Sequence, residues 1–190
     1  AGISFGKDDL IIPRTKENAL NGKHKKEFKT RLIFILAQLY SEERNLKASR
    51  YYEWVVNRNP DYDMAFQAKI NRALSFSGGD SKAIKAQLLK MLKDDKNIEY
   101  FDQIYFALAE IAFSDRQEDL AIEYLMTSVR VSVKNKKQKS KSLQKLGDWN
   151  YMKDEYLLAY QYYDTIQQVW GNDSVALSLI HISEPTRRYA

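Results

Sequence analysis

The sequence has no cysteine, only two histidines, few glycines and prolines, and no long apolar run. Without cysteine the chain cannot form disulfides, thiolate nucleophiles or zinc–thiolate sites, and it is compatible with either redox environment. Seven glycines and three prolines in 190 residues suit long helices with few breaks. No stretch reaches the ~18 apolar residues that a membrane-spanning helix requires. These absences favour a helical protein, and a hydrophobic content of 44% is enough for a core.

Apolar residues recur at helical spacing on both sides of a polar break at residues 114–119. The stripes consist of Ile104, Tyr105, Leu108, Ile111 and Ala112 before the break, and of Leu120, Ala121, Tyr124, Leu125 and Ser128 after it. We therefore predict two helices within Asp102–Ser132. Ala109 and Ala121 are small enough to let antiparallel helices approach closely, and this layout of bulky and small residues fits a tetratricopeptide unit.

Similar segments lie upstream and downstream of this pair. The copies are Ile33-x2-Leu36-Ala37-x2-Tyr40 with Ala48-x3-Tyr52, Leu143-x2-Leu146-Gly147-x2-Asn150 with Ala159-x3-Tyr163, and a weaker one with Ile70, Leu74, Gly78, Gly79, Ala83 and Leu88. The second-helix alanines stand at positions 48, 83, 121 and 159, which are 35, 38 and 38 residues apart. Tetratricopeptide units have about 34 residues, so extended helices or connectors are expected. One unit leaves apolar surface open and needs neighbours. We predict an all-α fold, a tetratricopeptide-like α-solenoid of antiparallel helix pairs.

The predicted organisation has three parts. Residues 1–28 are expected to be the remnant of a preceding repeat followed by a basic connector. Residues 172–190 are expected to be a non-native tail, because Leu177–Arg187 resembles a translated sequencing adapter of the transposon-end type. The four pairs between them are 29–60, 61–96, 97–133 and 139–171, with individual helices expected at Glu27–Tyr40, Leu46–Asn57, Asp61–Phe76, Asp80–Leu92, Leu143–Lys153 and Tyr156–Trp170.

Two lysine-rich segments, Lys23–Lys26 and Lys134–Lys141, raise the question of an anionic partner. Clustered lysines can bind the phosphates of nucleic acid or lipid. We favour the alternative, that the first is a solvated connector and the second the exposed start of a helix. No aromatic residue interleaves with the second cluster, so the stacking surface of a single-strand binding groove is missing. We therefore expect no nucleic-acid partner.

The sequence offers few groups for catalysis. Of the two histidines, His181 lies in the adapter-like tail and His24 lies in the lysine-rich connector, where the sequence gives it no partner. Nucleophilic catalysis without cysteine would need Ser or Thr beside a base. The acidic residues follow exposed helix faces and form no metal-ligand spacing. We expect a protein that is not an enzyme and has no cofactor and no metal site.

Several phrases in residues 29–169 carry a closer resemblance. They are Phe34-Ile35-Leu36-Ala37-Gln38-Leu39-Tyr40, Asn59-Pro60 followed by Met64-Ala65-Phe66, Gly79-Asp80-Ser81-Lys82, Leu88-Leu89-Lys90-Met91-Leu92-Lys93-Asp94, Asp102–Ala112 and Ser132-Val133-Lys134-Asn135. In this order they resemble the tetratricopeptide lipoproteins of the gliding-motility and type IX secretion machinery, the SprE/PorW type. The degenerate second unit is a shared feature.

The resemblance implies a protein-binding component on the periplasmic side of the outer membrane. It implies a lipid anchor on an N-terminal cysteine outside this fragment, as the only link to the membrane, and partners within the secretion and motility machinery. Two other functions stay open on the sequence alone. One is a regulatory or chaperone-adaptor tetratricopeptide module unrelated to secretion. The other is an RNA-binding helical repeat, which normally has a stricter period than 35 to 38 residues.

Successive first helices of a solenoid line a concave surface, where such proteins bind partners. Phe106 and Phe113 lie off the stripe through Leu108 and Ile111, which suggests contact with a partner; the alternative is packing on the next unit. The residues predicted by helical phase to face this groove are Arg31, Phe34, Gln38, Arg72, Phe106, Glu110, Phe113, Lys141, Asp148 and Tyr151.

Overall fold

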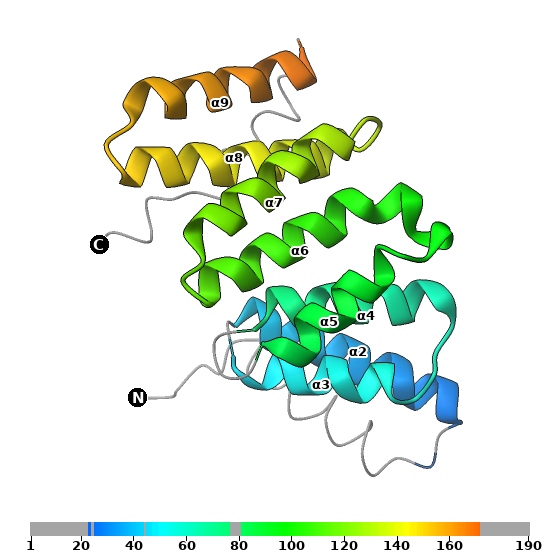
Figure 1. The fold of residues 1–190 in the computed structure, drawn as a ribbon. Coiled ribbons are helices and arrows are strands. Elements are labelled where there is room, and N and C mark those ends of the chain that lie inside the picture. The colour runs from blue at the N-terminus through cyan, green and yellow to red at the C-terminus, as the bar shows by residue number, and fades with distance from the viewer. Residues whose placement is uncertain (1–22, 24, 44, 77–80, 172–190) are drawn as a thin grey trace, which may run out of the picture. The chain divides into compact units, whose positions relative to one another are not determined.

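The computed structural model describes residues 23, 25–43, 45–76 and 81–171, and within them every regular element is a helix (Figure 1). The predicted all-α class is therefore confirmed. The elements are α2 (Lys26–Glu42), α3 (Lys47–Val56), α4 (Tyr62–Leu74), α5 (Lys82–Met91), the 3-10 helix η1 (Asp95–Tyr100), α6 (Phe101–Ser114), α7 (Glu118–Val131), α8 (Lys136–Met152) and α9 (Tyr156–Trp170). Several predicted features lie outside the described residues: the remnant repeat, His24, Gly78 and Gly79 of the weak copy, and the adapter-like tail. Of the basic connector, the structure describes Lys23, Lys25 and Lys26.

The helices begin and end close to the predicted positions, with two differences. α8 starts at Lys136, seven residues before the predicted Leu143, so the lysine-rich segment forms its first turns as we had favoured. The Asn135 side chain caps this helix, because its Oδ1 accepts a hydrogen bond of 3.1 Å from the backbone N–H of Gln138. The second difference is the 3-10 helix η1, which lies between the predicted helix that ends at Leu92 and the pair predicted within Asp102–Ser132.

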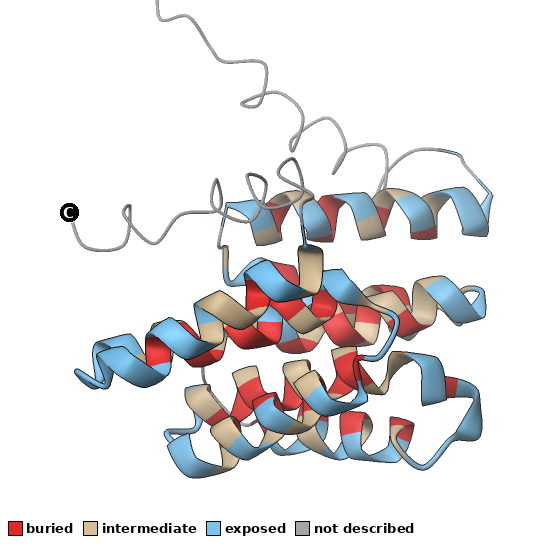
Figure 2. Cartoon of the chain, turned by 90° about the horizontal axis from the view of Figure 1, so that it is seen from above, coloured by how far each residue is buried: buried red, intermediate tan, exposed pale blue. Residues whose placement is uncertain are grey.

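The chain divides into two compact units, and α6 contributes to both. One unit contains residues 1–98 and 107–121, and the other contains residues 99–106 and 122–190. In Figure 2, buried residues recur along one side of most described helices, as the sequence period predicts. Each unit thus has its own buried residues, and the two are described separately below.

In the first unit, α2 and α3 pack side by side and α4 packs on α3. Tyr40 stacks on Tyr51 with ring centroids 5.1 Å apart. The buried cluster that joins these three helices consists of Ile33, Leu36, Ala37, Tyr40, Ala48, Tyr51, Tyr52, Val55 and Ala68. The small residues Ala37 and Ala48 are fully buried, as the predicted close approach of α2 and α3 requires.

The weak second copy is packed differently from the prediction. Ala83 was expected at a buried helix crossing, but it is exposed. Instead, Ile84, Leu88 and Met91 of α5 are buried at i, i+4 and i+7. The prediction that Ala83 is buried is therefore wrong, and the next residue, Ile84, is buried in its place. The larger Ile84 side chain has more apolar surface to remove from water.

In the second unit, a buried polar network joins the start of α6 to α7 and α8. Asp102, which is 3% exposed, accepts a hydrogen bond of 2.9 Å from the Ser132 hydroxyl. The Ser128 hydroxyl donates to the Asp102 carbonyl at 2.7 Å and lies 2.8 Å from the Ser142 hydroxyl. Since buried polar groups are costly unless paired, the network fixes how these three helices pack.

The helices α8 and α9 form the last pair of this unit. They pack through Leu143, Leu146, Ala159 and Ile166, all of which are buried. Gly147 is the small residue at their crossing: a Cβ atom built there would lie 2.6 Å from Cε1 of Tyr163. Within the described residues, no helix is both long and apolar enough to cross a bilayer.

Candidate functional site

Three of the predicted groove residues lie on α2. Arg31 and Gln38 are exposed and remain available for a partner. Phe34 is only half-buried, and its ring meets the Tyr52 ring edge-on at 5.8 Å between centroids. Phe34 therefore has a packing role inside the first unit, in addition to any contact with a partner.

Arg72 on α4 is committed to an intramolecular ion pair. Its Nη2 atom lies 2.8 Å from Oε1 of Glu53 on α3, and its side chain is 17% exposed. The Nε atom of Arg72 is buried and has no hydrogen-bond partner among the described residues. Arg72 is thus a link between α4 and α3, and a charge reversal there would disturb packing as well as binding.

Glu110 and Phe113 on α6 are half-buried, and both already interact within the protein. The argument that Phe113 lacks an intramolecular role is therefore wrong. It failed because the sequence stripe through Leu108 and Ile111 covers only one side of α6, whereas this helix contributes to two units. Phe106, which lies in the second unit, is also half-buried.

The last three predicted residues lie on α8 in the second unit. Asp148 accepts a hydrogen bond of 2.8 Å from the Tyr163 hydroxyl, and Tyr151 is 57% exposed. Lys141 is exposed, and desolvation of its ammonium group, followed by the charge of Lys137, lowers the pKa of that group. Of these three, Tyr151 is the one that offers open apolar surface.

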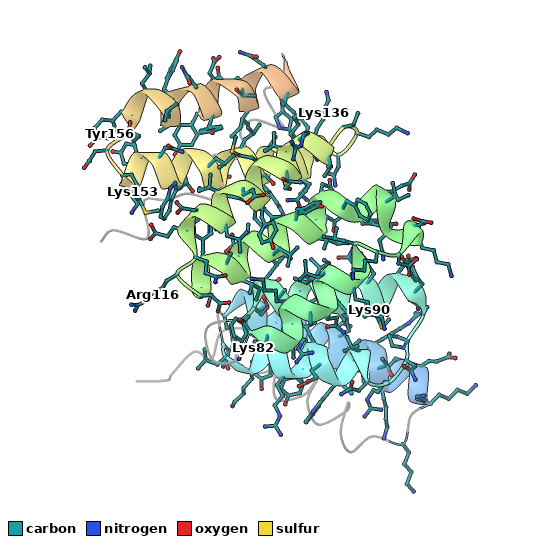
Figure 3. The ribbon with its side chains drawn as sticks, in the orientation of Figure 1. Lys82, Lys90, Arg116, Lys136, Lys153 and Tyr156 are labelled. Carbon is teal, nitrogen blue, oxygen red and sulfur yellow. The ribbon has the colours of Figure 1, made fainter. Side chains whose placement is uncertain are left out.

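Tyr151 belongs to a larger apolar surface that sequence reasoning missed. It surrounds the α8–α9 turn, where Figure 3 labels Lys153 and Tyr156. The Tyr151 and Tyr156 rings meet edge-on there, with their centroids 5.4 Å apart. Lys153 lies over the Trp149 ring at 4.6 Å, which anchors the base of the turn. The exposed members of this surface, which we call the α9 face, are Tyr151, Met152, Tyr156, Leu157, Leu158, Tyr160 and Tyr163.

The α9 face had a signal in the sequence. The segment Tyr156–Trp170 has more apolar residues than one buried stripe can use, and it has no lysine or arginine. A helix whose apolar residues extend around most of its surface is normally covered on more than one side. The repeat pattern assigns only Ala159 and Tyr163 of this segment to packing.

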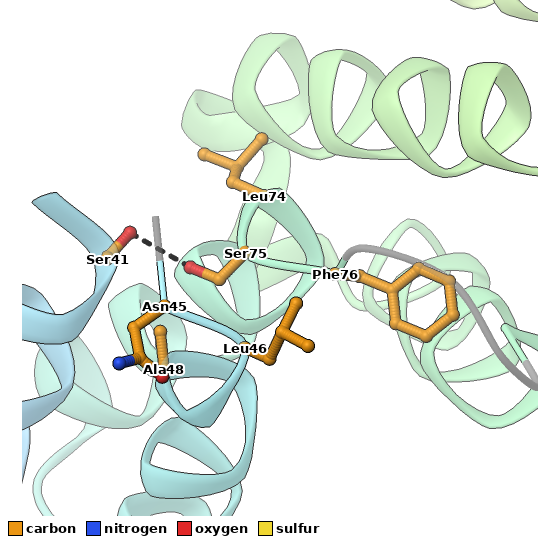
Figure 4. A pocket seen from close by; sticks show the side chains of 7 residues that line it. All are labelled: Ser41, Asn45, Leu46, Ala48, Leu74, Ser75 and Phe76. Carbon is orange, nitrogen blue, oxygen red and sulfur yellow. Dashed lines mark hydrogen bonds between the residues drawn. The ribbon is translucent and has the colours of Figure 1, made fainter. Parts of the chain in front are cut away.

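The first unit contains a small cavity of about 160 Å³ between the α2–α3 turn and the end of α4 (Figure 4). The Ser41 and Ser75 hydroxyls lie 3.0 Å apart at its edge. Leu46, Leu74 and Phe76 supply most of its apolar wall. Among the described residues that line it, none carries a charge.

Among the described residues, burial and neighbouring polar groups raise the pKa of three tyrosines. Burial is the main reason that the pKa of Tyr52 is raised to about 12, with a smaller contribution from Glu42, while hydrogen bonds to Ser41 and Asn71 oppose the rise. The pKa of Tyr124 is raised by burial and by Glu123. The Asp154 carboxylate, through its hydrogen bond with the hydroxyl, raises the pKa of Tyr156. Among the described residues no three His, Cys, Asp or Glu side chains gather as metal ligands would.

The sequence matches no protein-family model and no curated protein. The family resemblance set out above therefore remains a prediction.

Proposed function

We propose that this protein is a non-enzymatic scaffold that binds other proteins, built as a tetratricopeptide-like solenoid of antiparallel helix pairs. The repeated use of a small residue at the helix crossing supports the repeat assignment. Ala37, Ala109 and Gly147 occupy equivalent positions in three first helices and are buried, and Ala48, Ala121 and Ala159 do the same in the second helices.

The observation that carries the binding function is the α9 face. Tyr160 is 67% exposed and Leu157 is 72% exposed, next to Tyr151 and Tyr156. Monomeric soluble proteins rarely leave large contiguous apolar patches open to water, and aromatic residues are enriched at protein interfaces. A protein partner would remove this surface from water.

Following the sequence resemblance, we further propose that the partner belongs to a type IX secretion or gliding-motility machinery on the periplasmic side of the outer membrane. The exposed α2 residues Arg31 and Gln38 are candidates for a second contact with it. A regulatory or chaperone-adaptor role would use the same kind of surface with a different partner.

Site-specific photocrosslinking tests the proposal. A photoreactive phenylalanine analogue is placed at Tyr160 or Tyr151 in the complete gene product in its own cells, with exposed Lys93 as the matched control position. We expect both face positions, and not position 93, to crosslink to the same protein. No crosslink at either face position, or equal crosslinking at position 93, would contradict the scaffold function. A cytoplasmic chaperone as the partner would contradict the secretion assignment.

A further inference from the structure

The cavity beside the α2–α3 turn lies between two consecutive helix pairs of the first unit, so it is not at an end of the described chain. Leu46, which precedes α3, is 72% exposed, and Leu74 at the end of α4 is 40% exposed. Both leucines line the cavity, and Phe76 lies across from them (Figure 4). An apolar wall is therefore open to solvent although helices flank it on both sides.

The stability of the fold does not explain why a leucine stands at position 46. Asn45 caps the start of α3, because its Oδ1 atom accepts a hydrogen bond of 3.0 Å from the backbone N–H of Lys47. The residue that precedes each of the other second helices is polar, namely Ser81, Gln117 and Glu155. Leu46 thus provides neither a cap nor buried core surface. A residue that departs from the local pattern without a structural gain points to a function.

The size and lining of the cavity fit one phenyl ring. An apolar cavity of about 150 Å³ can hold a benzene molecule, and this cavity measures about 160 Å³. The adjoining segments outside the described residues are Arg44 and residues 77–80, which read Ser-Gly-Gly-Asp. They contain no apolar side chain, so they cannot supply the ring.

The rim of the cavity adds hydrogen-bonding groups to this apolar wall. The Ser41 and Ser75 hydroxyls lie 3.0 Å apart there. The Nδ2 group of Asn45, whose Oδ1 is engaged in the cap, has no hydrogen-bond partner among the described residues. A benzene-like molecule would not use these groups, whereas the backbone beside a phenylalanine offers a C=O that can accept from an amide. Apolar pockets with a few polar groups are the usual form of specific binding sites.

We propose that the cavity between Leu46 and Leu74 binds the phenylalanine side chain of a segment of another protein, with the backbone of that segment hydrogen-bonded to Asn45. This inference rests on the proposed scaffold function and names the chemistry of one contact with the partner. A second copy of this chain and the apolar residues of segments 1–22 and 172–190 are the other occupants that the experiments below distinguish.

Titration with a blocked amino acid tests the site. N-acetyl-phenylalanine amide is added to the full chain, and the methyl signals of Leu46, Ala48 and Leu74 are followed by NMR. We expect saturable shifts of these signals, and N-acetyl-alanine amide at the same concentrations should cause none. Absence of a saturable shift, or equal shifts with the alanine compound, would overturn the proposal.

Leu46→Ser separates binding from folding. The substitution removes part of the apolar wall and should weaken binding of N-acetyl-phenylalanine amide about five- to tenfold. The urea midpoint should not fall, because Leu46 is 72% exposed and Asn45 still caps α3. Ile98→Ser is the matched control: Ile98 is also apolar, is 58% exposed and lies outside the cavity, so its loss should leave the affinity unchanged. Equal weakening by both variants would overturn the site.

Crosslinking identifies the occupant. A photoreactive analogue is placed at position 46 of the complete gene product in its own cells, with position 98 as the control, and the crosslinked peptide is sequenced by mass spectrometry. We expect a phenylalanine-containing peptide from the protein that also crosslinks at position 160. No crosslink at position 46, or a peptide without phenylalanine, would overturn the proposal. A peptide from residues 1–22 or 172–190, or from a second copy of this chain, would do the same.

The two proposals fail in different ways. If N-acetyl-phenylalanine amide does not bind but positions 151 and 160 crosslink to one protein, the scaffold function stands and the cavity is not a contact site. If the amide binds as expected but no position crosslinks to another protein, the scaffold function and the protein partner of the cavity are both wrong.

Discussion

Single small residues decide how closely paired helices pack in this protein. Ala37 and Gly147 occupy equivalent positions in two first helices. At Gly147 a tyrosine ring lies so close that Cε1 of Tyr163 would be 2.6 Å from a Cβ atom built there. The Tyr163 hydroxyl donates to Oδ1 of Asp148 at 2.8 Å, which helps to hold the ring beside Gly147. Glycine is needed here for close approach, since Gly147 lies inside a regular helix.

We expect Gly147→Ala to lower the free energy of unfolding by about 1–2 kcal/mol. Alanine is favoured over glycine in a helix interior by about 1 kcal/mol, but overpacking against the ring typically costs 1–3 kcal/mol or more. Urea denaturation followed by circular dichroism measures the change. In a Tyr163→Ala background the same substitution should stabilise, because the clash is gone. Equal destabilisation in both backgrounds would contradict the assignment.

At the level of helices, the sequence predicted where each helix lies better than it predicted the residues at which the helix begins and ends. The bounds of α9 were predicted to the residue, because Glu155 and Gly171 interrupt an otherwise apolar segment. The start of α8 was predicted seven residues too late, because its first turns contain lysine, glutamine and serine but no apolar residue that would mark a helical stripe. Ala83 was wrongly predicted to be buried, because the weak apolar pattern after Gly78 and Gly79 allows two alignments of the repeat on α5 that differ by one residue. In such a segment, tertiary packing selects the register.

Helix α4 depends on a cap as well as on packing. The Asp61 Oδ1 atom accepts a 2.9 Å hydrogen bond from the backbone N–H of Met64. We expect Asp61→Ala to destabilise the protein by about 1 kcal/mol, the usual contribution of an N-cap. Asp63→Ala is the matched control: it removes an exposed carboxylate from the same first turn but no cap, so the loss should be a few tenths of a kcal/mol. Equal losses in chemical denaturation would mean that charge, not the capping bond, stabilises this end.

At the scale of the whole molecule, the class and most of the core could be predicted, whereas the binding surface could not. The helical period fixes which side of each helix is apolar, and Ala48, Ala121 and Ala159 are buried as expected. Helical phase does not reveal which polar or aromatic side chains already interact within the protein. Arg72 and Phe113 were therefore assigned to a groove, although Arg72 pairs with Glu53 and Phe113 also has an intramolecular interaction. The α9 face was missed although the apolar residues of Tyr156–Trp170 outnumber those of one stripe, because helical phase shows which residues share a side and not whether that side is covered.

The helix α6 bears on how the molecule unfolds. It runs without interruption from Phe101 to Ser114, yet its first residues belong to one compact unit and its remainder to the other. Neither unit can therefore lose its share of α6 without breaking a continuous helix, and helices are cooperative. This continuity predicts one cooperative unfolding transition for the described part of the chain.

Two matched core deletions test this prediction. Leu36 in the first unit is 0% exposed and Leu146 in the second is 1% exposed. We expect Leu36→Ala and Leu146→Ala each to cost about 2–5 kcal/mol, as cavity-forming leucine deletions do. Each should shift the midpoint of a single transition in which the calorimetric and van't Hoff enthalpies agree. Two resolved transitions, with each variant moving only one of them, would mean that the units unfold independently and that α6 breaks between Phe106 and Ala107.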